Sequence, residues 1–150
     1  MDTRYLGVDL GTKRIGLAIS DPHTGVVSPL SVINTRAGLE QNASAIIDVA
    51  EEYDAGGIVI GLPLNMDGTE GPQARLSKQL AEAIRKACQA RRNAATITVH
   101  LHDERLTSHA ADRRLLGRDL TRKKKKNRQD AIAAQVLLES FLDRLTGKNT

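Results

Sequence analysis

The chain has 150 residues, of which 40% are apolar, and it carries a formal net charge of +4 with a single cysteine. This length suits one hydrophobic core, so we expect a single domain over residues 1–146 and a frayed tail at 147–150. One cysteine excludes an internal disulfide and a cysteine-based zinc site, and no apolar run approaches the roughly 18 residues of a membrane span, so we expect a cytoplasmic protein.

The first predicted element is a β-hairpin. Residues 5–10 and 14–20 are rich in Val, Ile and Leu, and the three residues between them suit a tight turn. Asp9 interrupts the first strand, where an unpaired carboxylate would be strongly destabilising. Its partner is therefore an arginine, the N–H groups of the turn, or a metal ion.

A third strand is predicted over residues 26–33, where Pro29 indicates an edge position or a bulge. Apolar residues at helical spacing predict an amphipathic helix over residues 37–53. The unbroken apolar run 57–61 is typical of a central strand buried on both faces. Together these elements predict a βαβ crossover.

The loop that follows, residues 62–72, is rich in turn residues, and loops at the end of a central strand commonly bind ligands. Asn65 in this loop is a candidate for contact with a substrate backbone, although a structural loop has the same composition. Pro72 suits the first turn of the next helix. The predicted buried stripe of that helix is made of Leu76, Leu80, Ala83, Ile84 and Ala87.

Polar and apolar residues alternate over residues 96–102, which predicts a strand with one polar face. Acidic residues follow this strand directly. His100 and His102 share a face, but no third soft ligand favours zinc. Asp103 and Glu104 point to opposite sides of an extended chain, so only one can face a given site. The residues alone leave open which one does, and Asp103 has Arg105 as an alternative partner.

The last third of the chain combines a basic segment with two predicted helices. A short helix is expected over residues 107–116, ended by Gly117, then a basic loop, then a helix over residues 127–145 with Asp130 on its inward stripe. Residues 105–128 contain ten Lys or Arg against two Asp, so the rest of the chain is net acidic. A polyanion such as nucleic acid is the partner that this asymmetry favours, and a solvated loop is the alternative.

The predicted order is β-β-β-α-β-α-β-α-α, an α/β fold with a mixed sheet, helices on both faces, and the first and fourth strands side by side. On this map Asp9, Glu104 and Asp130 can meet at one edge of the sheet. Three carboxylates repel one another unless a divalent cation joins them, and oxygen ligands suit Mg²⁺ or Mn²⁺.

Four ordered motifs resemble the YqgF family over nearly the whole chain. They are Gly7-Val8-Asp9-Leu10-Gly11-Thr12-Lys13-Arg14-Ile15-Gly16, Gly61-Leu62-Pro63-Leu64-Asn65-Met66-Asp67-Gly68, Asp103-Glu104-Arg105-Leu106-Thr107, and Lys123 to Lys126 followed by Asp130-Ala131. Members of that family are ribonuclease H-like and are described as Holliday junction resolvases and as nucleases that mature the 5′ end of pre-16S ribosomal RNA. The resemblance implies a metal-dependent nuclease whose catalytic and metal-binding residues are Asp9, Glu104 and Asp130. Gln129 departs from the family, which often has an aliphatic residue there.

The substrate-binding residues that we expect are basic or polar: Lys13, Arg14, Asn65, Arg105, Arg122, Lys123, Lys124, Lys125, Lys126 and Arg128. Tyr5, Tyr53 and Phe141 fall on predicted core positions and leave no platform for stacking bases, so recognition should rest on backbone charge and shape. Precursor ribosomal RNA is the favoured substrate and branched DNA the alternative. Two other functions remain open: an actin-like phosphotransfer module, because Asp9-Leu10-Gly11-Thr12 also resembles that phosphate-binding hairpin, and a non-catalytic RNA-binding assembly factor.

Overall fold

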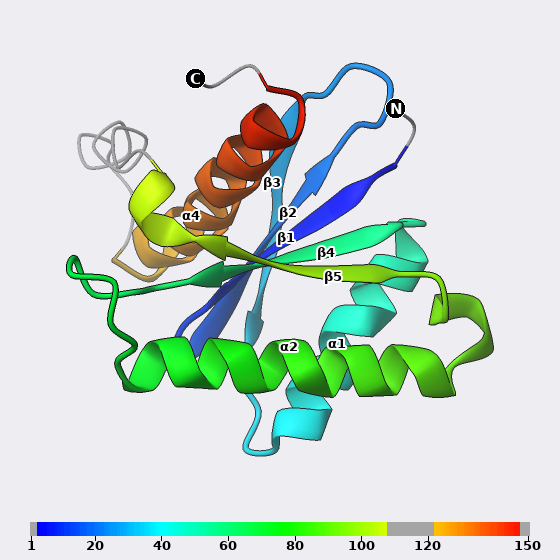
Figure 1. The fold of residues 1–150 in the computed structure, drawn as a ribbon, viewed down its shortest axis with the longest axis horizontal. Helices are drawn as coiled ribbons and strands as arrows, with labels where there is room; N and C mark the ends of the chain where they lie inside the picture. The colour runs from blue at the N-terminus through cyan, green and yellow to red at the C-terminus, as the bar shows by residue number, and fades with distance from the viewer. Residues whose placement is uncertain (1–2, 108–121, 148–150) are drawn as a thin grey trace.

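The computed structural model describes residues 3–107 and 122–147, with side chains described from residue 129 onward in the second range. Five strands form one mixed sheet in the order β3-β2-β1-β4-β5 (Figure 1). The strands are β1 (Tyr5–Leu10), β2 (Arg14–Ser20), β3 (Val27–Asn34), β4 (Gly57–Leu62) and β5 (Thr98–Asp103). The helices are α1 (Leu39–Glu52), α2 (Pro72–Ala90) and α4 (Arg122–Leu145), with two 3₁₀ turns, η1 (Arg92–Ala94) and η2 (Glu104–Leu106).

Strand pairing follows the order of the elements along the chain. β1, β2 and β3 pair as antiparallel neighbours, whereas β1 pairs with β4, and β4 with β5, in parallel. The two parallel connections run through α1 and α2, as βαβ crossovers require. The carboxyl ends of β1, β4 and β5 therefore lie at the same edge of the sheet, and the predicted neighbourhood of the first and fourth strands is confirmed.

Helices cover both faces of the sheet, as predicted. α1 and α2 cover one face and α4 covers the other (Figure 1). The cluster beneath α1 and α2 contains most of the large aliphatic side chains, and Cys88 lies within it as a small core residue. The cluster beneath α4 is smaller and includes Tyr5, Ala134 and Leu138.

The edge position predicted from Pro29 is confirmed. β3 is the outermost strand on its side of the sheet, and its register with β2 shifts between Leu17 and Ala18, where Ala18 faces Pro29. An edge strand leaves one row of backbone groups unpaired, so the missing N–H of proline costs no ladder bond there. None of the described helices is both long and apolar enough to cross a membrane.

Three details of the sequence prediction are wrong. The last helix begins at Arg122 instead of 127, so the lysine run is helical and not a loop; Lys and Arg are good helix formers once a helix is anchored further along. Leu76 is 45% exposed, because the buried stripe of α2 runs through the neighbouring Ser77. Tyr53 is 37% exposed, because α1 ends just before it. The predicted helix over 107–116 and its stop at Gly117 lie outside the described residues, apart from Thr107.

Candidate active site

Two of the three predicted carboxylates are in contact. Asp9 lies near the end of β1, and Glu104 begins the turn η2 directly after β5. The Glu104 side chain crosses the intervening strand β4 above Gly61 and forms a hydrogen bond with Asp9. A β-carbon added at Gly61 would lie 2.5 Å from Glu104 Oε1, so only glycine leaves the carboxylate this path.

The contact changes the protonation of Glu104. Burial is the largest cause, followed by the hydrogen bond to Asp9 and its charge, and together they raise the pKa of Glu104 to about 8. Because two carboxylates bond to each other only through a shared proton, the pair holds one proton near neutral pH. Asp103 adds a further negative charge nearby, and it also raises the pKa of Glu104.

The third predicted carboxylate, Asp130, has a different partner. Its Oδ2 accepts a hydrogen bond of 2.7 Å from Nε of Arg14, and the two side chains are 30% and 20% exposed. Arg14 begins β2, and Gly16 two residues later pairs with Asp9 across the β1–β2 ladder. A β-carbon at Gly16 would collide with the carbonyl oxygen of Asp130, so α4 packs at Asp130 directly on the strand beside Asp9.

These oxygen donors are of the type that a hard divalent cation takes. A carboxylate pair that holds a proton between its oxygens exchanges that proton for a cation readily, and neither soft sulfur nor free imidazole is present in the pair. Within the part of the chain that the structure describes, no three His, Cys, Asp or Glu side chains are grouped closely enough to hold a metal ion. The structure thus joins Asp9 to Glu104, and the three-carboxylate metal site stays a prediction.

The neighbouring acidic residue, Asp103, forms an ion pair with Arg105. The guanidinium of Arg105 donates from Nε and Nη2 to the Asp103 carboxylate, and the backbone N–H of Arg105 donates to the same group. The hydrogen bond from the Arg105 side chain is the largest cause that holds the pKa of Asp103 below its usual value. The pairing of Asp103 with Arg105 is thus observed, while Glu104 turns to Asp9.

A buried network that the sequence prediction missed anchors the turn carrying Glu104. Ser140 Oγ on α4 lies 3.1 Å from the carbonyl oxygen of Leu106 and 2.9 Å from Nε2 of His102, and both His102 and Ser140 are buried. The only hydroxyl proton of Ser140 goes to the carbonyl, so Nε2 of His102 must donate. The sequence signal is a polar residue on the apolar stripe of the last helix. Ser140 on α4 therefore ties β5, through His102, to η2, through Leu106.

Two further predicted substrate residues, Lys13 and Asn65, lie at the same edge of the sheet, because Lys13 follows β1 and Asn65 follows β4. Lys13 is exposed at the tip of the β1–β2 hairpin. The side chain of Asn65 donates to Thr69 Oγ1 at 2.9 Å and so helps to shape the loop after β4. The side chains of Arg122, Lys123, Lys124, Lys125, Lys126 and Arg128 lie outside the described residues.

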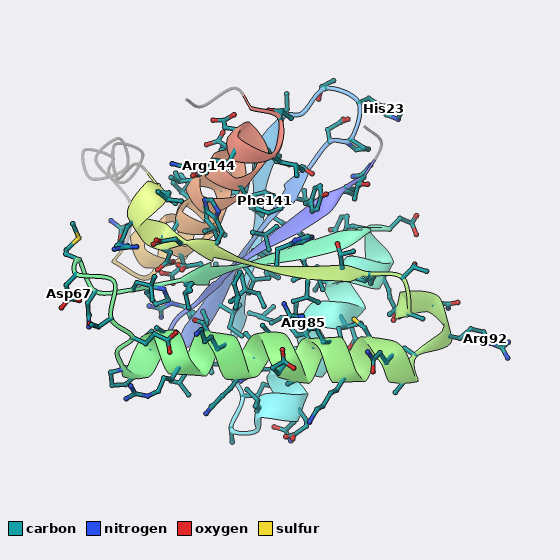
Figure 2. The ribbon with its side chains drawn as sticks, in the orientation of Figure 1. His23, Asp67, Arg85, Arg92, Phe141 and Arg144 are labelled. Atoms are coloured by element: carbon teal, nitrogen blue, oxygen red, sulfur yellow. The ribbon has the colours of Figure 1, made fainter. Side chains whose placement is uncertain are left out.

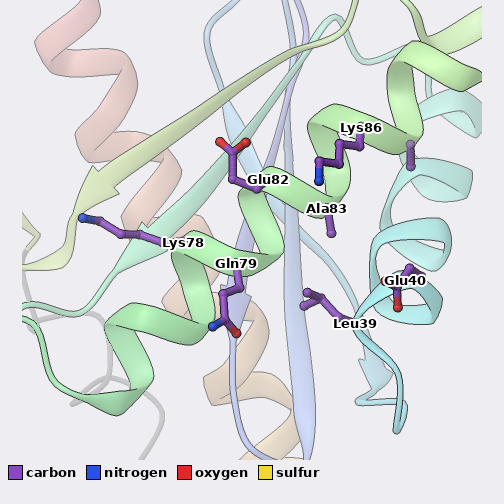
Figure 3. Close-up of a pocket in the computed structure, with 8 residues that line it drawn as sticks. Leu39, Glu40, Lys78, Gln79, Glu82, Ala83 and Lys86 are labelled. Atoms are coloured by element: carbon purple, nitrogen blue, oxygen red, sulfur yellow. The ribbon is translucent and has the colours of Figure 1, made fainter.

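One cavity of the structure lies away from this site. A cavity of about 610 Å³ lies between α1 and α2 and is lined by Leu39, Glu40, Lys78, Gln79, Glu82, Ala83, Lys86 and Ala87 (Figure 3). None of these residues belongs to β1, β5 or η2, which carry the carboxyl pair and its neighbours. A second cavity, of about 310 Å³, has Leu10, Gly11 and Thr12 in its lining and so lies beside the end of β1 that carries Asp9.

Comparison with known proteins gives a consistent result. The family model described as "RuvX: Holliday junction resolvase" matches residues 3–144. A protein of Syntrophomonas wolfei subsp. wolfei named "Putative pre-16S rRNA nuclease" is 41% identical over 140 residues, which span 93% of this chain and 94% of that protein. A protein of the same name from Anaeromyxobacter sp. (strain K) is 43% identical over 141 residues, covering 94% of this chain and 97% of that protein.

Solved structures share the fold at low sequence identity. Thermus thermophilus RuvC matches with a TM-score of 0.57 at 13% identity, covering 97% of this chain and 98% of that chain. The yeast mitochondrial Holliday junction resolvase Ydc2 matches with a TM-score of 0.57 at 15% identity, covering 98% of this chain and 80% of that chain. This likeness confirms the predicted ribonuclease H-like architecture.

Proposed function

Because this chain belongs to the RuvX family, we propose that it is a nuclease that hydrolyses phosphodiester bonds of structured nucleic acid. The favoured substrate is precursor 16S ribosomal RNA, since two relatives of more than 40% identity over nearly their full length are named "Putative pre-16S rRNA nuclease". Cutting at the 5′ end is the expectation that the resemblance to the YqgF family supplies. The observation that carries the proposal is the contact between Asp9 and Glu104, with the pKa of Glu104 raised to about 8.

The proposed cofactor is Mg²⁺ or Mn²⁺, held by Asp9, Glu104 and Asp130. A divalent ion among carboxylates activates water and stabilises the leaving oxygen of a phosphodiester. Asp9 is fixed by the β1 ladder, and Glu104 by a turn anchored through Ser140, so both carboxylates are held before substrate arrives.

Arg14 is proposed to link the acidic site to the substrate. Its guanidinium pairs with Asp130 here, and a phosphate oxygen offers the same planar, charge-assisted hydrogen bonding. Arg14 can therefore balance the charge of Asp130 before a cation binds, and contact phosphate once Asp130 serves as a ligand. Lys13, Asn65 and Arg105 are proposed to contact the substrate beside it.

The basic residues from Arg122 to Arg128 are proposed to bind phosphates through charge. For single-stranded nucleic acid, the slope of log K against log salt changes by about 0.7 for every phosphate that a protein neutralises. Changing Lys123, Lys124, Lys125 and Lys126 to Ala should therefore weaken binding most at low salt and flatten the slope. An unchanged slope would show that these lysines do not contact the backbone.

One experiment tests the nuclease proposal directly. Labelled precursor 16S ribosomal RNA and a four-way DNA junction are offered side by side with Mg²⁺, with Mn²⁺ and with chelator. We expect cutting only with cation, and a loss of kcat of at least about 100-fold in Asp9→Asn and Glu104→Gln. Glu82→Gln, which removes an exposed carboxylate paired with Arg85 on α2, is the matched control and should cut like the wild type.

The same experiment separates the second candidate, Holliday junction resolution, which the description of the matching family model favours. Cutting of the junction with the RNA left intact would establish that alternative. RNA binding without cutting under every condition would instead favour a non-catalytic assembly factor. Full cutting by Asp9→Asn would show that Asp9 is not a catalytic residue.

A further inference from the structure

Met66 is the most exposed large apolar side chain among the described residues, at 87%. It lies in the loop between β4 and α2, just beyond the carboxyl end of β4. Single exposed apolar residues are common on protein surfaces and need no function. Met66 differs from such residues in two respects, namely the ordered backbone that carries it and its position beside the candidate active site.

The loop is shaped by its own hydrogen bonds and not by burial of Met66. The N–H of Asn65 donates to the carbonyl of Thr69 at 2.9 Å, and the N–H of Gly68 donates to the carbonyl of Asn65 at 2.8 Å. Asp67 accepts from both the N–H and the hydroxyl of Thr69. Gly68 has a φ of 89°, which closes the turn at little strain. Met66 is thus held outward on an ordered backbone.

This loop is fastened to the candidate active site. Nη1 of Arg105 donates to the carbonyl oxygen of Met66 at 3.3 Å, and Arg105 directly follows Glu104. Figure 2 shows the adjacent Asp67 at the outer end of the loop. The exposed thioether therefore stands at the rim of the site that a nucleic acid would have to approach.

No aromatic side chain of the described residues can serve as a stacking platform at this rim. Tyr5 and Phe141 pack against each other with ring centroids 5.3 Å apart, and Tyr5 is buried. Tyr53 follows α1 and precedes β4, so it lies at the opposite end of that strand from Met66. Many proteins that bend nucleic acid insert an apolar wedge between base steps, and methionine is one of the residues used.

We propose that Met66 inserts between bases beside the scissile phosphate, and that the preferred substrate therefore contains a helical step that opens easily. A boundary between duplex and single strand, or a branch, offers such a step, whereas an uninterrupted duplex opposes insertion by its stacking. This inference rests on the proposed nuclease function and names the substrate feature that the site selects.

The test uses an RNA stem with a single-stranded tail that carries 2-aminopurine at the boundary, and a continuous RNA duplex with the same probe. Both are titrated with full-length protein in chelator, and cutting is then measured with Mn²⁺. Wild type should raise the fluorescence of the boundary probe as the base unstacks. Met66→Ala should abolish the rise and bind the boundary substrate about tenfold more weakly, while Met66→Leu should keep both.

Two further variants make the result specific. Val26→Ala truncates another exposed apolar residue in the β2–β3 turn, at the far end of the sheet, and should behave like the wild type. Glu104→Gln should keep the fluorescence rise but lose cutting, which separates insertion from chemistry. A full fluorescence rise and unchanged boundary preference in Met66→Ala would overturn the wedge while leaving the nuclease intact. A wild type that neither binds nor cuts either RNA would overturn the wedge and the proposed function together.

Discussion

The two faces of the sheet are built from opposite kinds of residue. The face beneath α1 and α2 presents large aliphatic side chains that are fully buried: Leu6, Val8, Ile15, Leu17, Ile58 and Ile60. On the face beneath α4, the positions around Asp9 are glycines, namely Gly7, Gly16 and Gly61. The alternation of strand side chains puts both patterns in the same three strands.

The contrast shows how the domain separates stability from chemistry. Aliphatic volume on one face supplies most of the hydrophobic stabilisation, at roughly 25 cal/mol per Å² of buried apolar area. Glycines on the other face give up that volume, so that α4 packs directly on the strands and the Glu104 carboxylate crosses β4 to Asp9. Mutations on the aliphatic face should therefore reduce stability, and mutations on the glycine face should reduce activity.

The largest expected effect on stability comes from the aliphatic face. Ile60 is fully buried beneath α1 and α2, and truncation to Ala leaves a cavity that the surrounding core fills only in part. We expect Ile60→Ala to lower the free energy of unfolding by about 2–5 kcal/mol, measured by urea denaturation. Nuclease activity per folded molecule should be unchanged at temperatures where the variant stays folded; a specific loss of kcat would contradict the separation.

Gly61, the adjacent residue in β4, should show the reverse pattern, with little loss of stability and a large loss of activity. A methyl group at Gly61 would meet Oε1 of Glu104, the far end of a flexible side chain, so the carboxylate moves while the strand stays in place. We expect Gly61→Ala to change the free energy of unfolding by less than about 1 kcal/mol. Because Glu104 is displaced from Asp9, kcat should fall by about 100-fold. Wild-type cutting by this variant would show that Glu104 need not cross β4.

Gly16 lies on the same face of the sheet as Gly61, but its neighbour is the backbone of α4 and not the end of a flexible side chain. A methyl group there would collide with the backbone carbonyl of Asp130, so α4 itself must shift away from β2. We expect Gly16→Ala to destabilise the fold by about 1–3 kcal/mol and to reduce cutting as well, since Asp130 moves with the helix. Thermal unfolding and the cutting assay on the same preparation check both effects; a stable but inactive variant would place the fault in the site alone.

The pH dependence of the metal-free protein gives a smaller effect. The pKa of Glu104 rises from an ordinary 4.5 to about 8 on folding, so the folded state keeps a proton that the unfolded state releases in that range. Stability should therefore fall as pH rises from about 5 to 8, opposite to the behaviour of a salt-bridged carboxylate. Because water reaches part of the side chain, we expect about 1–2 kcal/mol.

Two variants check the assignment of this pH dependence. Glu104→Gln should flatten the curve of melting temperature against pH, and Glu82→Gln should leave it as in the wild type. Equal slopes in the wild type and Glu104→Gln would mean that another group holds the proton.

Much of this architecture follows from local sequence patterns. The hairpin, the crossover strands and the helix that begins at Pro72 are predicted by apolar periodicity and turn residues, and Asp9 is identifiable as a carboxylate inside an apolar strand. The choice of Glu104 over Asp103 rests partly on the resemblance to the YqgF family. The lysine run is the exception, because charge favours both an exposed loop and an exposed helix, and only the anchoring of α4 decides between them.

The details of the site needed the tertiary structure. No local pattern shows that Gly61 must be small, because the atom that needs the space comes from Glu104, which follows another strand. Pairing of Arg14 with Asp130 joins residues 116 positions apart, and the network of His102 and Ser140 joins residues 38 apart. Such contacts depend on register and helix placement, which periodicity alone does not fix.

The smallest expected effect concerns a polar residue, Ser77, in the aliphatic layer between α2 and the sheet. Ser77 lies on the buried stripe of α2, and its Oγ is the one buried side-chain oxygen or nitrogen of the described residues that has no hydrogen-bond partner. An unpaired buried hydroxyl destabilises the fold, and Ala is the better helix former, so Ser77→Ala should raise the free energy of unfolding by up to about 1 kcal/mol. Chemical denaturation resolves a change of this size when wild type and variant share the same slope. A loss of stability in Ser77→Ala would mean that the hydroxyl has a partner, and that polar groups contribute on both faces of the sheet.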